Sequence, residues 1–299
     1  MRIFVTGGTG LIGRALCKAL SESGHHLTVL SRDPAAAKLK CGPGVEIVDS
    51  LEVWTPASRF DAVINLAGAP IADRRWSESR KRALWESRVD LTRRLVEAMG
   101  RADQKPAVLI GGSAIGVYGD RGDETLDEAS DCRGEGFSER LCAAWEAETL
   151  NAAALGIRVC LLRTGLVVAP RGGFLARMLP LFKLGLGGRI GDGRQWMSWV
   201  HLDDHIALTR FLIDSPHLAG VFNATAPRPV TNAEFTARLA AALKRPALLP
   251  VPAGPLRLGL GEMAELLLGG QRVLPGRARE AGFEFRFETL ESALRDVLG

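Results

Sequence analysis

The chain carries a glycine-rich segment near its beginning, Thr6-Gly7-Gly8-Thr9-Gly10-Leu11-Ile12-Gly13. An apolar run over residues 2–6 precedes this segment and predicts a β-strand. A helical pattern follows over residues 11–23, and Gly24 closes that helix in the usual C-terminal position. A strand, a glycine turn and a helix in this order are typical of the first unit of a parallel α/β sheet.

Three glycines of this segment have separate predicted roles. Gly7 permits a tight turn, Gly10 lets the backbone approach a pyrophosphate, and Gly13 allows the helix to pack closely on the strand. The N-terminus of the helix offers unpaired N–H groups to an anion. A plain glycine turn is the alternative, but the position between a strand and a helix favours a dinucleotide-binding loop.

The alternation of strand and helix patterns continues through the first half of the chain. Further strands are expected at about residues 27–30, 45–48, 62–66, 107–110, 157–162 and 221–224, and further helices at about 76–99, 138–154 and 203–213. Apolar strands separated by amphipathic helices form βαβ units with right-handed crossovers. The predicted fold class is therefore α/β, a doubly wound parallel sheet of the Rossmann type.

A smaller α+β domain is expected toward the C-terminus. Residues 170–196 are rich in glycine and are predicted to be mostly loop, and Thr231-Asn232-Ala233-Glu234 fits a capping box that opens a helix. The expected division assigns residues 1–169 and 197–225 to the Rossmann domain, and residues 170–196 and 226–299 to the C-terminal domain. The substrate is expected to bind between the two.

Composition and charge limit the function classes. With 46% hydrophobic and 24% charged residues among 299, the chain is typical of a globular enzyme. Its net charge of +4 is spread along the chain instead of forming a basic stripe, so no nucleic-acid partner is expected. Five cysteines without a C-x-x-C motif predict neither a disulfide framework nor a zinc site. No apolar run reaches the roughly 20 residues of a membrane helix, and a cytoplasmic protein is expected.

The end of the second strand indicates which dinucleotide would bind. An NAD site places Asp or Glu about 20 residues after the glycines, where it bonds the adenosine ribose. This chain has Ser31 and Arg32 there, and no carboxylate before Asp33. The Arg32 guanidinium can pair with a 2′-phosphate, Ser31 adds a hydroxyl donor and Arg14 lies nearby, so NADP (NADPH) is favoured over NAD. The alternative is that Arg32 only caps a turn.

Three further motifs follow: one after the fourth strand, one after the fifth strand and one near residue 200. They are Asn65-Leu66-Ala67-Gly68, Gly112-Ser113 with Val117-Tyr118-Gly119, and Trp199-Val200-His201-Leu202-Asp203-Asp204. With these residues the chain resembles the extended short-chain dehydrogenases/reductases, the group that contains nucleotide-sugar epimerases and dehydratases. More narrowly, Ser87-Arg88-Val89 and the segments 187–195 and 270–275 resemble an atypical "epimerase family" branch with a C-terminal domain of unknown function. The resemblance covers essentially the whole chain.

The glycine segment and the resemblance together imply a set of cofactor contacts. They are Thr6, Gly7, Thr9, Gly10, Leu11, Ile12, Gly13, Ser31, Arg32, Asn65, Leu66, Ala67, Gly68, Arg88 and Ser113. The resemblance also implies a homodimer, formed through the helices expected at about 76–99 and 138–154.

This chain lacks the catalytic pair of residues of the family that it resembles. Most of its members use Tyr-x-x-x-Lys, in which the lysine lowers the tyrosine pKa so that a phenolate can exchange a proton. The single tyrosine, Tyr118, is followed four residues later by Gly122, and no lysine has a tyrosine four positions before it. Counting back from Glu146 on the expected helix puts Ser138 at the tyrosine position and Cys142 at the lysine position.

Ser113 and Tyr118 are the expected catalytic residues. Ser113 matches the strand-end Ser or Thr that bonds a substrate oxygen in the family, with an offset of one residue left open by Ala114. Tyr118 is expected at the mouth of the pocket, with a packed aromatic in a turn as the alternative. Cys142 is interpreted as a small core residue, and the acidic residues between 123 and 128 as a solvated loop.

The segment 187–196 is the expected substrate lid. Its side chains Arg189 and Arg194 suit an anionic or phosphate-bearing substrate, and Trp196, beside Gln195, can stack on a ring. The alternative is a surface glycine loop with incidental arginines.

Two histidines near residue 200 raise the question of a metal. His201 and His205 stand four residues apart among carboxylates, a spacing that can bind zinc. Asp203 is better explained as the N-cap of the next helix, so no metal is predicted.

The predicted function is that of an NADP-binding oxidoreductase or nucleotide-sugar-epimerase-like enzyme that acts on a small carbonyl or hydroxyl substrate. Hydride would pass to or from nicotinamide C4 while Ser113 orients the oxygen, and a group other than tyrosine, or water, would transfer the proton. The alternative is a non-catalytic NADP(H) sensor or interaction module, which the missing catalytic pair favours.

Overall fold

A seven-stranded parallel sheet forms the centre of the computed structural model, which describes residues 1–299. The strands lie in the order β11-β7-β5-β4-β1-β2-β3, so the chain order reverses between β1 and β4. Their bounds are β1 (Arg2–Thr6), β2 (His26–Leu30), β3 (Glu46–Val48), β4 (Ala62–Asn65), β5 (Val108–Ala114), β7 (Arg158–Thr164) and β11 (Gly220–Ala224). The prediction of a doubly wound, Rossmann-type sheet is confirmed.

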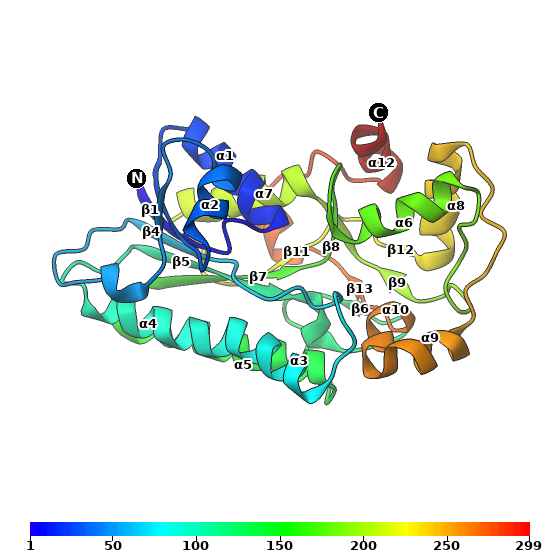
Figure 1. The fold of residues 1–299 in the computed structure, drawn as a ribbon, viewed down its shortest axis with the longest axis horizontal. Coiled ribbons are helices and arrows are strands. Elements are labelled where there is room, and N and C mark those ends of the chain that lie inside the picture. Colours follow the sequence, from blue (N-terminus) through cyan, green and yellow to red (C-terminus); the bar gives the residue numbers. More distant parts are fainter.

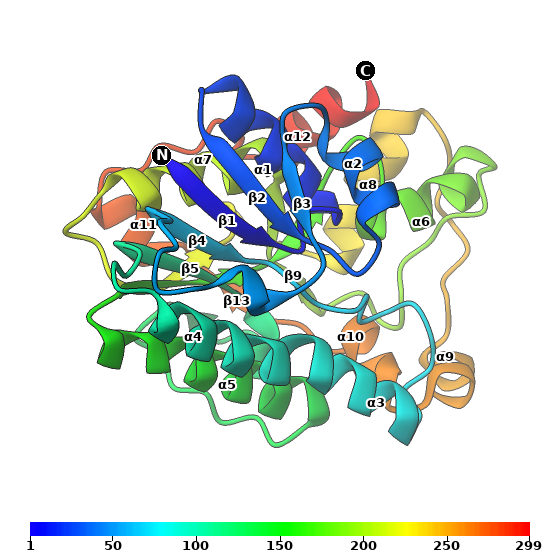
Figure 2. The same cartoon turned by 60° about the vertical axis from the view of Figure 1, so that its left-hand side comes forward.

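Helices cover both faces of this sheet (Figures 1 and 2). One face carries α1 (Leu11–Glu22), α2 (Pro34–Cys41) and α7 (Leu202–Asp214), and the other carries α3 (Glu78–Trp85), α4 (Leu91–Arg101) and α5 (Phe137–Leu150). Strand alternation explains the two layers: in β1, Ile3 and Val5 join the core under α1 and α7, whereas Phe4 joins the core under α4. Both faces are apolar because a parallel sheet is buried on both sides.

The long helix expected at 76–99 is interrupted. Ser77 caps α3, and a π-helical turn at Glu86–Asp90 separates α3 from α4. A π-helical turn inserts an extra residue into a helix, and such turns occur frequently at functional sites. Here the turn carries Arg88.

A smaller C-terminal unit has its own core, to which Val168, Trp199, Phe235 and Leu290 contribute. The elements around this core are β8 (Leu166–Val168), α6 (Gly173–Lys183), β9 (Trp196–Met197), β10 (Trp199–His201), β12 (Val230–Thr231), α8 (Asn232–Leu243) and α12 (Leu290–Leu298). Between α8 and α12 the chain forms α9 (Ala253–Leu260), α10 (Glu265–Leu268) and β13 (Arg272–Val273), which pairs with β6 (Thr125–Leu126). Helix α11 (Gly276–Glu280) packs on β11 and places Ala278 in the core of the large sheet. The C-terminal domain is thus present, while the boundaries given above stay a prediction.

Two local expectations are corrected and one is confirmed. The segment 170–196 contains helix α6, whose Leu175 and Phe182 are buried, and Pro180 within it hid the helix because proline usually ends one. The N-cap of α7 is His201 and not Asp203, since the His201 ring nitrogen Nδ1 accepts from the Asp203 N–H at 3.1 Å. The capping box of Thr231 and Glu234 at α8 is confirmed.

Candidate functional site

The glycine segment lies at the carboxyl end of β1, where the strand order reverses. Gly7 has φ of 73°, and a Cβ at this position would stand 2.5 Å from the carbonyl carbon of Leu66. A Cβ on Gly13 would stand 2.2 Å from the carbonyl oxygen of Gly7. Both positions therefore need glycine for the loop to pack between α1 and the segment that follows β4.

The front of the loop is open. Gly10 is exposed at the N-cap of α1, no side chain caps this helix, and its first turn holds no acidic residue. A Cβ on Gly10 would meet only the carbonyl oxygen of Gly7, at 3.3 Å. The first N–H groups of α1, beside the half-buried Leu11 and Ile12, keep their hydrogen-bonding capacity for an anion. These residues fit the pyrophosphate of a dinucleotide.

A buried network supports this loop from beneath. The Thr6 hydroxyl donates to Asn65 Oδ1 at 2.6 Å and accepts from the Ala67 N–H at 3.2 Å. Asn65 Nδ2 donates to the Thr92 hydroxyl at 2.7 Å, and so does the Trp145 indole at 3.1 Å. Since Thr6 and Asn65 are each 1% exposed, their side chains hold the loop and leave cofactor contact to the backbone.

A free arginine follows the end of β2. Arg32 is exposed, and its guanidinium makes no hydrogen bond or ion pair within the chain. The turn before α2 is capped by Asp33, which accepts from the Ala36 N–H at 3.0 Å, so Arg32 is not the capping residue. Ser31 is engaged locally, accepting from the Asp33 N–H at 3.2 Å. Arg14, in the first turn of α1, is also exposed.

Arg88 lies against Gly68 and Ala69, in the segment that follows β4. From the π-helical turn its guanidinium donates to the Ala69 carbonyl at 3.0 Å and lies 5.5 Å from the Trp145 ring. A Cβ on Gly68 would stand 2.8 Å from the Arg88 guanidinium carbon, so the small Gly68 admits this arginine. Burial lowers the pKa of Arg88 from its ordinary value.

Ser113 lies in a buried charged cluster. Its hydroxyl donates to Glu146 Oε1 at 2.6 Å, and Arg163 pairs with both carboxyl oxygens of Glu146 at 2.8 Å. Burial acts to lower the pKa of Arg163, but the hydrogen bonds and the charge of Glu146 outweigh it and raise this pKa above its ordinary value. The Ser113 hydroxyl is therefore directed toward α5.

Tyr118 lies inside the protein and not at a pocket mouth. Its side chain is fully buried, and its hydroxyl oxygen lies 2.9 Å both from the Asp127 carbonyl and from Asn223 Oδ1. The Arg163 guanidinium covers the ring at 4.8 Å. Burial raises the pKa of Tyr118. This environment matches the packed aromatic that was the alternative interpretation.

The first turns of α5 hold the residues counted onto the tyrosine and lysine positions. Ser138 is 6% exposed, and its hydroxyl donates to Glu265 Oε1 in α10 at 2.8 Å. Cys142 packs with Ile115 and Val117 beyond the end of β5, and burial raises the pKa of its thiol to about 12. Glu265 was absent from the expected site, because no local pattern announces a contact across 127 residues.

The segment 187–196 carries two exposed arginines and two side chains that form hydrogen bonds with the rest of the protein. Arg189 and Arg194 are exposed. Gln195 donates to the carbonyls of Ile190 at 3.1 Å and Leu267 at 2.9 Å, which fixes the segment to α10. The Trp196 indole donates to Asp123 Oδ1 at 2.8 Å, and the Arg272 guanidinium covers its ring at 4.6 Å.

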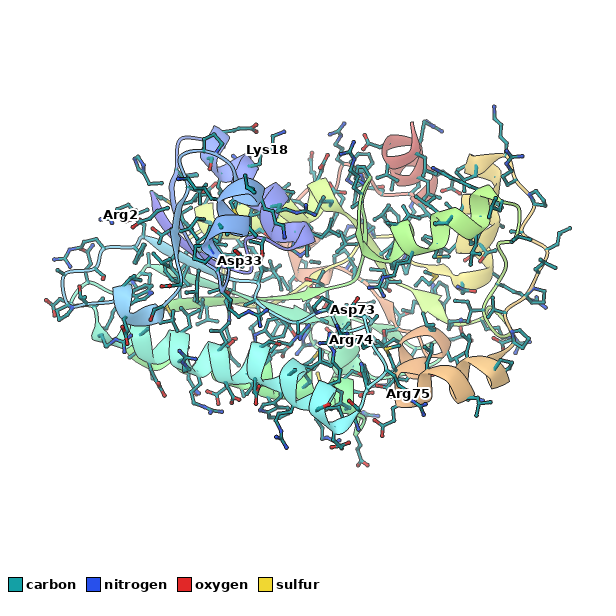
Figure 3. All side chains as sticks on the ribbon, in the orientation of Figure 1. Arg2, Lys18, Asp33, Asp73, Arg74 and Arg75 are labelled. Carbon is teal, nitrogen blue, oxygen red and sulfur yellow. The ribbon has the colours of Figure 1, made fainter.

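The segment between β4 and α3 joins the two units, and Figure 3 shows Asp73, Arg74 and Arg75 on it. Asp73 pairs with Arg177 of α6 at 3.2 Å. Arg75 lies beside the turn before α10, where a Cβ on Gly261 would stand 3.0 Å from its Nε. The segment therefore connects the end of β4 to both sides of the C-terminal unit.

No group of three or more His, Cys, Asp or Glu side chains is placed to hold a metal ion. His205 is fully buried beside the Thr164 hydroxyl, at 3.0 Å, and burial lowers its pKa to about 4. None of the helices combines the length and apolar character that crossing a membrane requires.

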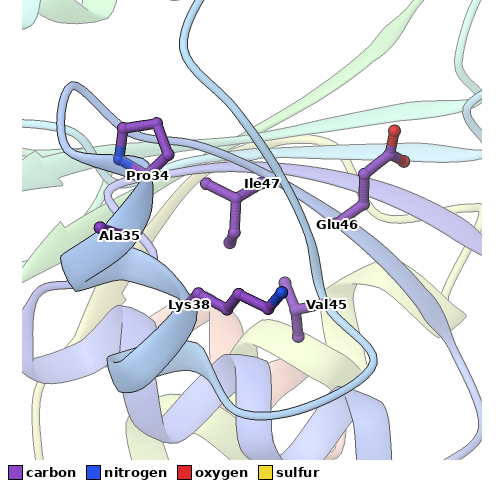
Figure 4. A pocket seen from close by; sticks show the side chains of 6 residues that line it. All are labelled: Pro34, Ala35, Lys38, Val45, Glu46 and Ile47. Atoms are coloured by element: carbon purple, nitrogen blue, oxygen red, sulfur yellow. The ribbon is translucent and has the colours of Figure 1, made fainter.

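A hollow of about 420 Å³ lies away from the glycine loop, at the outer edge of the sheet (Figure 4). It is lined by Pro34, Ala35, Lys38, Val45, Glu46 and Ile47. None of the expected site residues borders it.

The fold and the open glycine loop define a dinucleotide-binding Rossmann protein. Comparison with known proteins agrees: residues 3–224 match the model of the NAD dependent epimerase/dehydratase family, and residues 251–297 match a domain of unknown function, DUF1731. The chain therefore belongs to the NAD-dependent epimerase/dehydratase family, as the resemblance implied.

Two similar proteins cover nearly the whole chain. The epimerase family protein Mb2239 of Mycobacterium bovis is 43% identical over 295 residues, which span 98% of this chain and 96% of the relative. The crystal structure of human epimerase family protein SDR39U1 (isoform 2) with NADPH has a TM-score of 0.90 at 35% identity and covers 99% of both chains.

A more distant structure supports the fold alone. UDP-glucuronic acid 4-epimerase from Bacillus cereus, in complex with UDP-glucuronic acid and NAD, has a TM-score of 0.80 at 18% identity. It covers 98% of this chain and 96% of its own.

Proposed function

We propose that this protein binds NADPH and acts as an oxidoreductase or epimerase-like enzyme on a small carbonyl or hydroxyl substrate. Two observations carry the proposal: the N-terminus of α1 is uncapped, and the free Arg32 follows β2, the strand that pairs with β1. The former suits a pyrophosphate, and the latter suits a 2′-phosphate where NAD proteins place a carboxylate. The NADPH in the similar human structure supports the same choice.

The chain's own residues divide the work of binding. The α1 N-terminus and Gly10 would hold the pyrophosphate, while Ser31 and Arg32 would hold the adenosine phosphate. When bound, NADPH supplies a hydride at nicotinamide C4. Ser113 would act as a positioning residue, because its hydroxyl already donates to Glu146. Tyr118 would also act as a positioning residue, because its hydroxyl is hydrogen-bonded inside the protein.

The substrate is proposed to be anionic and to lie between the two domains. Arg189 and Arg194 are the exposed cations of the 187–196 segment and would pair with a phosphate or carboxylate. Gln195 and Trp196 would act by holding that segment against α10 and the 120–124 loop, as their hydrogen bonds to Leu267 and Asp123 do now. The cytoplasmic location stays a proposal as well.

The function is tested with NADPH deuterated at nicotinamide C4. The protein is incubated with it and with fractionated cell metabolites, and mass spectrometry follows the label. Deuterium in one metabolite would establish hydride transfer and give the substrate class. Tight NADPH binding with no label in any fraction would contradict net reduction and favour the sensor, or an epimerase that recycles its cofactor.

The cofactor preference depends on Arg32. We expect Arg32→Asp to weaken NADPH binding by about 10- to 100-fold, because hydrogen bonds between charged groups contribute about 1.5–3 kcal/mol each. NADH binding should be weakened far less, since NADH lacks the 2′-phosphate. Both affinities are measured by titration of nicotinamide fluorescence. Lys18→Asp, on an exposed turn of α1, is the matched charge control. Equal losses for NADPH and NADH would refute the 2′-phosphate role.

A further inference from the structure

Ser138 lies beside the carboxyl end of β5. A Cβ on Gly116, in the turn after this strand, would stand 3.9 Å from the Ser138 Cβ. Cys142, one helical turn later, packs on the same turn. Parallel α/β sheets bind their ligands at the carboxyl ends of their strands. The Ser138 hydroxyl is therefore a proton-bearing group at the edge of the candidate site.

This hydroxyl is bonded to a carboxyl group from the C-terminal domain. The Ser138 Oγ lies 2.8 Å from Glu265 Oε1 and 3.2 Å from Glu139 Oε2. One hydroxyl proton serves one acceptor at a time, so a second proton is needed to bond both carboxyl groups fully. Ser138 is buried while Glu265 is an exposed residue. The Glu265 carboxyl therefore connects the buried hydroxyl with solvent.

The surroundings of Glu265 raise the pKa of its carboxyl group. Partial burial of the carboxyl raises its pKa, the negative charges of Glu139 and Glu262 act in the same direction, and the hydrogen bond from Ser138 opposes them. Of the neighbouring cations, Lys81 is already paired with Glu262. A raised pKa keeps a carboxyl proton available closer to neutral pH, as general acid catalysis requires.

The lysine position of the family offers no substitute. Counting back from Glu146 puts Cys142 at this position, and a buried thiol with a pKa of about 12 cannot lower the pKa of a neighbouring hydroxyl as a cation would. Two carboxyl groups are in hydrogen-bond contact with Ser138, and Glu265 is both the nearer one, at 2.8 Å against 3.2 Å for Glu139, and the more exposed one.

We propose that Ser138 and Glu265 form a proton relay that replaces Tyr-x-x-x-Lys, an inference that rests on the proposed function. When a hydride from NADPH reaches the carbonyl carbon and leaves NADP⁺, the C=O π pair moves onto oxygen. The Ser138 hydroxyl proton passes to that oxygen, the Glu265 carboxyl proton passes to Ser138 Oγ, and water returns a proton to the carboxylate. Oxidation runs the same transfers in reverse.

The relay is tested with Glu265→Gln and Ser138→Ala, using NADPH deuterated at nicotinamide C4 and the substrate identified above. We expect each variant to slow label transfer by about 10²-fold or more, the usual contribution of a general acid. NADPH affinity and thermal unfolding should match the wild type, which shows that both variants fold. Glu280→Gln, which removes an exposed carboxylate from α11 that makes no hydrogen bond or ion pair, should transfer label at the wild-type rate.

The pH profile separates a relay from a structural contact. In the direction of reduction, the wild-type rate should fall as pH rises through the Glu265 pKa, and this fall should be absent in Glu265→Gln. Infrared difference spectra give a readout without turnover: a protonated-carboxyl band should persist above the pH at which ordinary glutamates ionise, about 4.3. That band should be missing in Glu265→Gln.

The failures of the two proposals are distinguishable. No label transfer by the wild type would overturn the proposed function and the relay together. Transfer that neither Glu265→Gln nor Ser138→Ala slows would overturn the relay alone. An infrared titration showing Glu265 fully ionised across the active pH range would also overturn it.

Discussion

Glu146 is the one carboxylate that holds both Ser113 and Arg163. The side chains of Glu146 and Arg163 are only 10% and 7% exposed, so each charge depends on the other for compensation. Removing one partner of a buried ion pair leaves an uncompensated buried charge.

We therefore expect Glu146→Gln to lower the free energy of unfolding by about 3–5 kcal/mol, the usual cost of breaking a buried pair. Urea denaturation measures it. Glu148→Gln, two residues later on the same helix, is the control: its partner Arg93 is 49% exposed, and the loss should be about 1 kcal/mol or less. Equal losses in the two variants would contradict this account of Glu146.

The sequence motifs indicated which residues lie near the candidate site. They did not indicate what the side chain of each residue does there. Thr6 and Asn65 were expected as cofactor contacts because they belong to the motifs, yet their hydroxyl and amide groups are consumed by a network under the loop. Glu265 and the Glu146–Arg163 pair were unpredictable, since hydrogen bonds between distant segments leave no periodic signal in the sequence.

Among the elements, the loop from β1 to α1 uses its glycines for two different purposes. Gly13 is required by close packing within the protein, whereas Gly10 faces outward and leaves room for a ligand. The strands and long helices followed from apolar periodicity, although the helix expected at 76–99 is divided by a π-helical turn and β5 extends to Ala114. Helix α6 did not follow, because Pro180 and the surrounding glycines conceal its apolar face.

Substitutions at the two glycines should separate stability from binding. We expect Gly10→Val to abolish binding of both NADPH and NADH at a cost in stability of about 1 kcal/mol or less. Gly13→Val should lower stability by about 1–3 kcal/mol or more, because its Cβ would overlap the Gly7 carbonyl. Thermal unfolding and cofactor titration give the two quantities. Retained binding in Gly10→Val would mean that the loop is not the pyrophosphate site.

Considered as a whole, the molecule leaves one apolar stripe on the outer side of α5. Ala143 and Ala147 are exposed, and Leu150 is 45% exposed. These positions are spaced by four and three residues and therefore share one face of the helix. We propose that this face, together with α4, forms the contact of the homodimer that the family resemblance implies.

The molar mass of the protein, measured by light scattering as it elutes from a size-exclusion column, should then be about twice the chain mass of 32.1 kDa. Ala147→Glu should give a monomer, because a charge would be buried at the centre of the contact. Ala242→Glu, on an exposed part of α8, should leave the mass unchanged. A wild-type protein with the mass of one chain would rule out the dimer.

The last helix, α12, completes a core that begins far earlier in the chain. Leu290 and Leu294 pack with Val168 and Phe235, whereas the seven-stranded sheet is complete once residue 224 has been added. The C-terminal segment also reaches back to the sheet, because Ala278 and Phe285 belong to the core under α1 and α7. A chain cut after residue 224 would therefore keep all seven strands and still leave the apolar surfaces of both cores open to water.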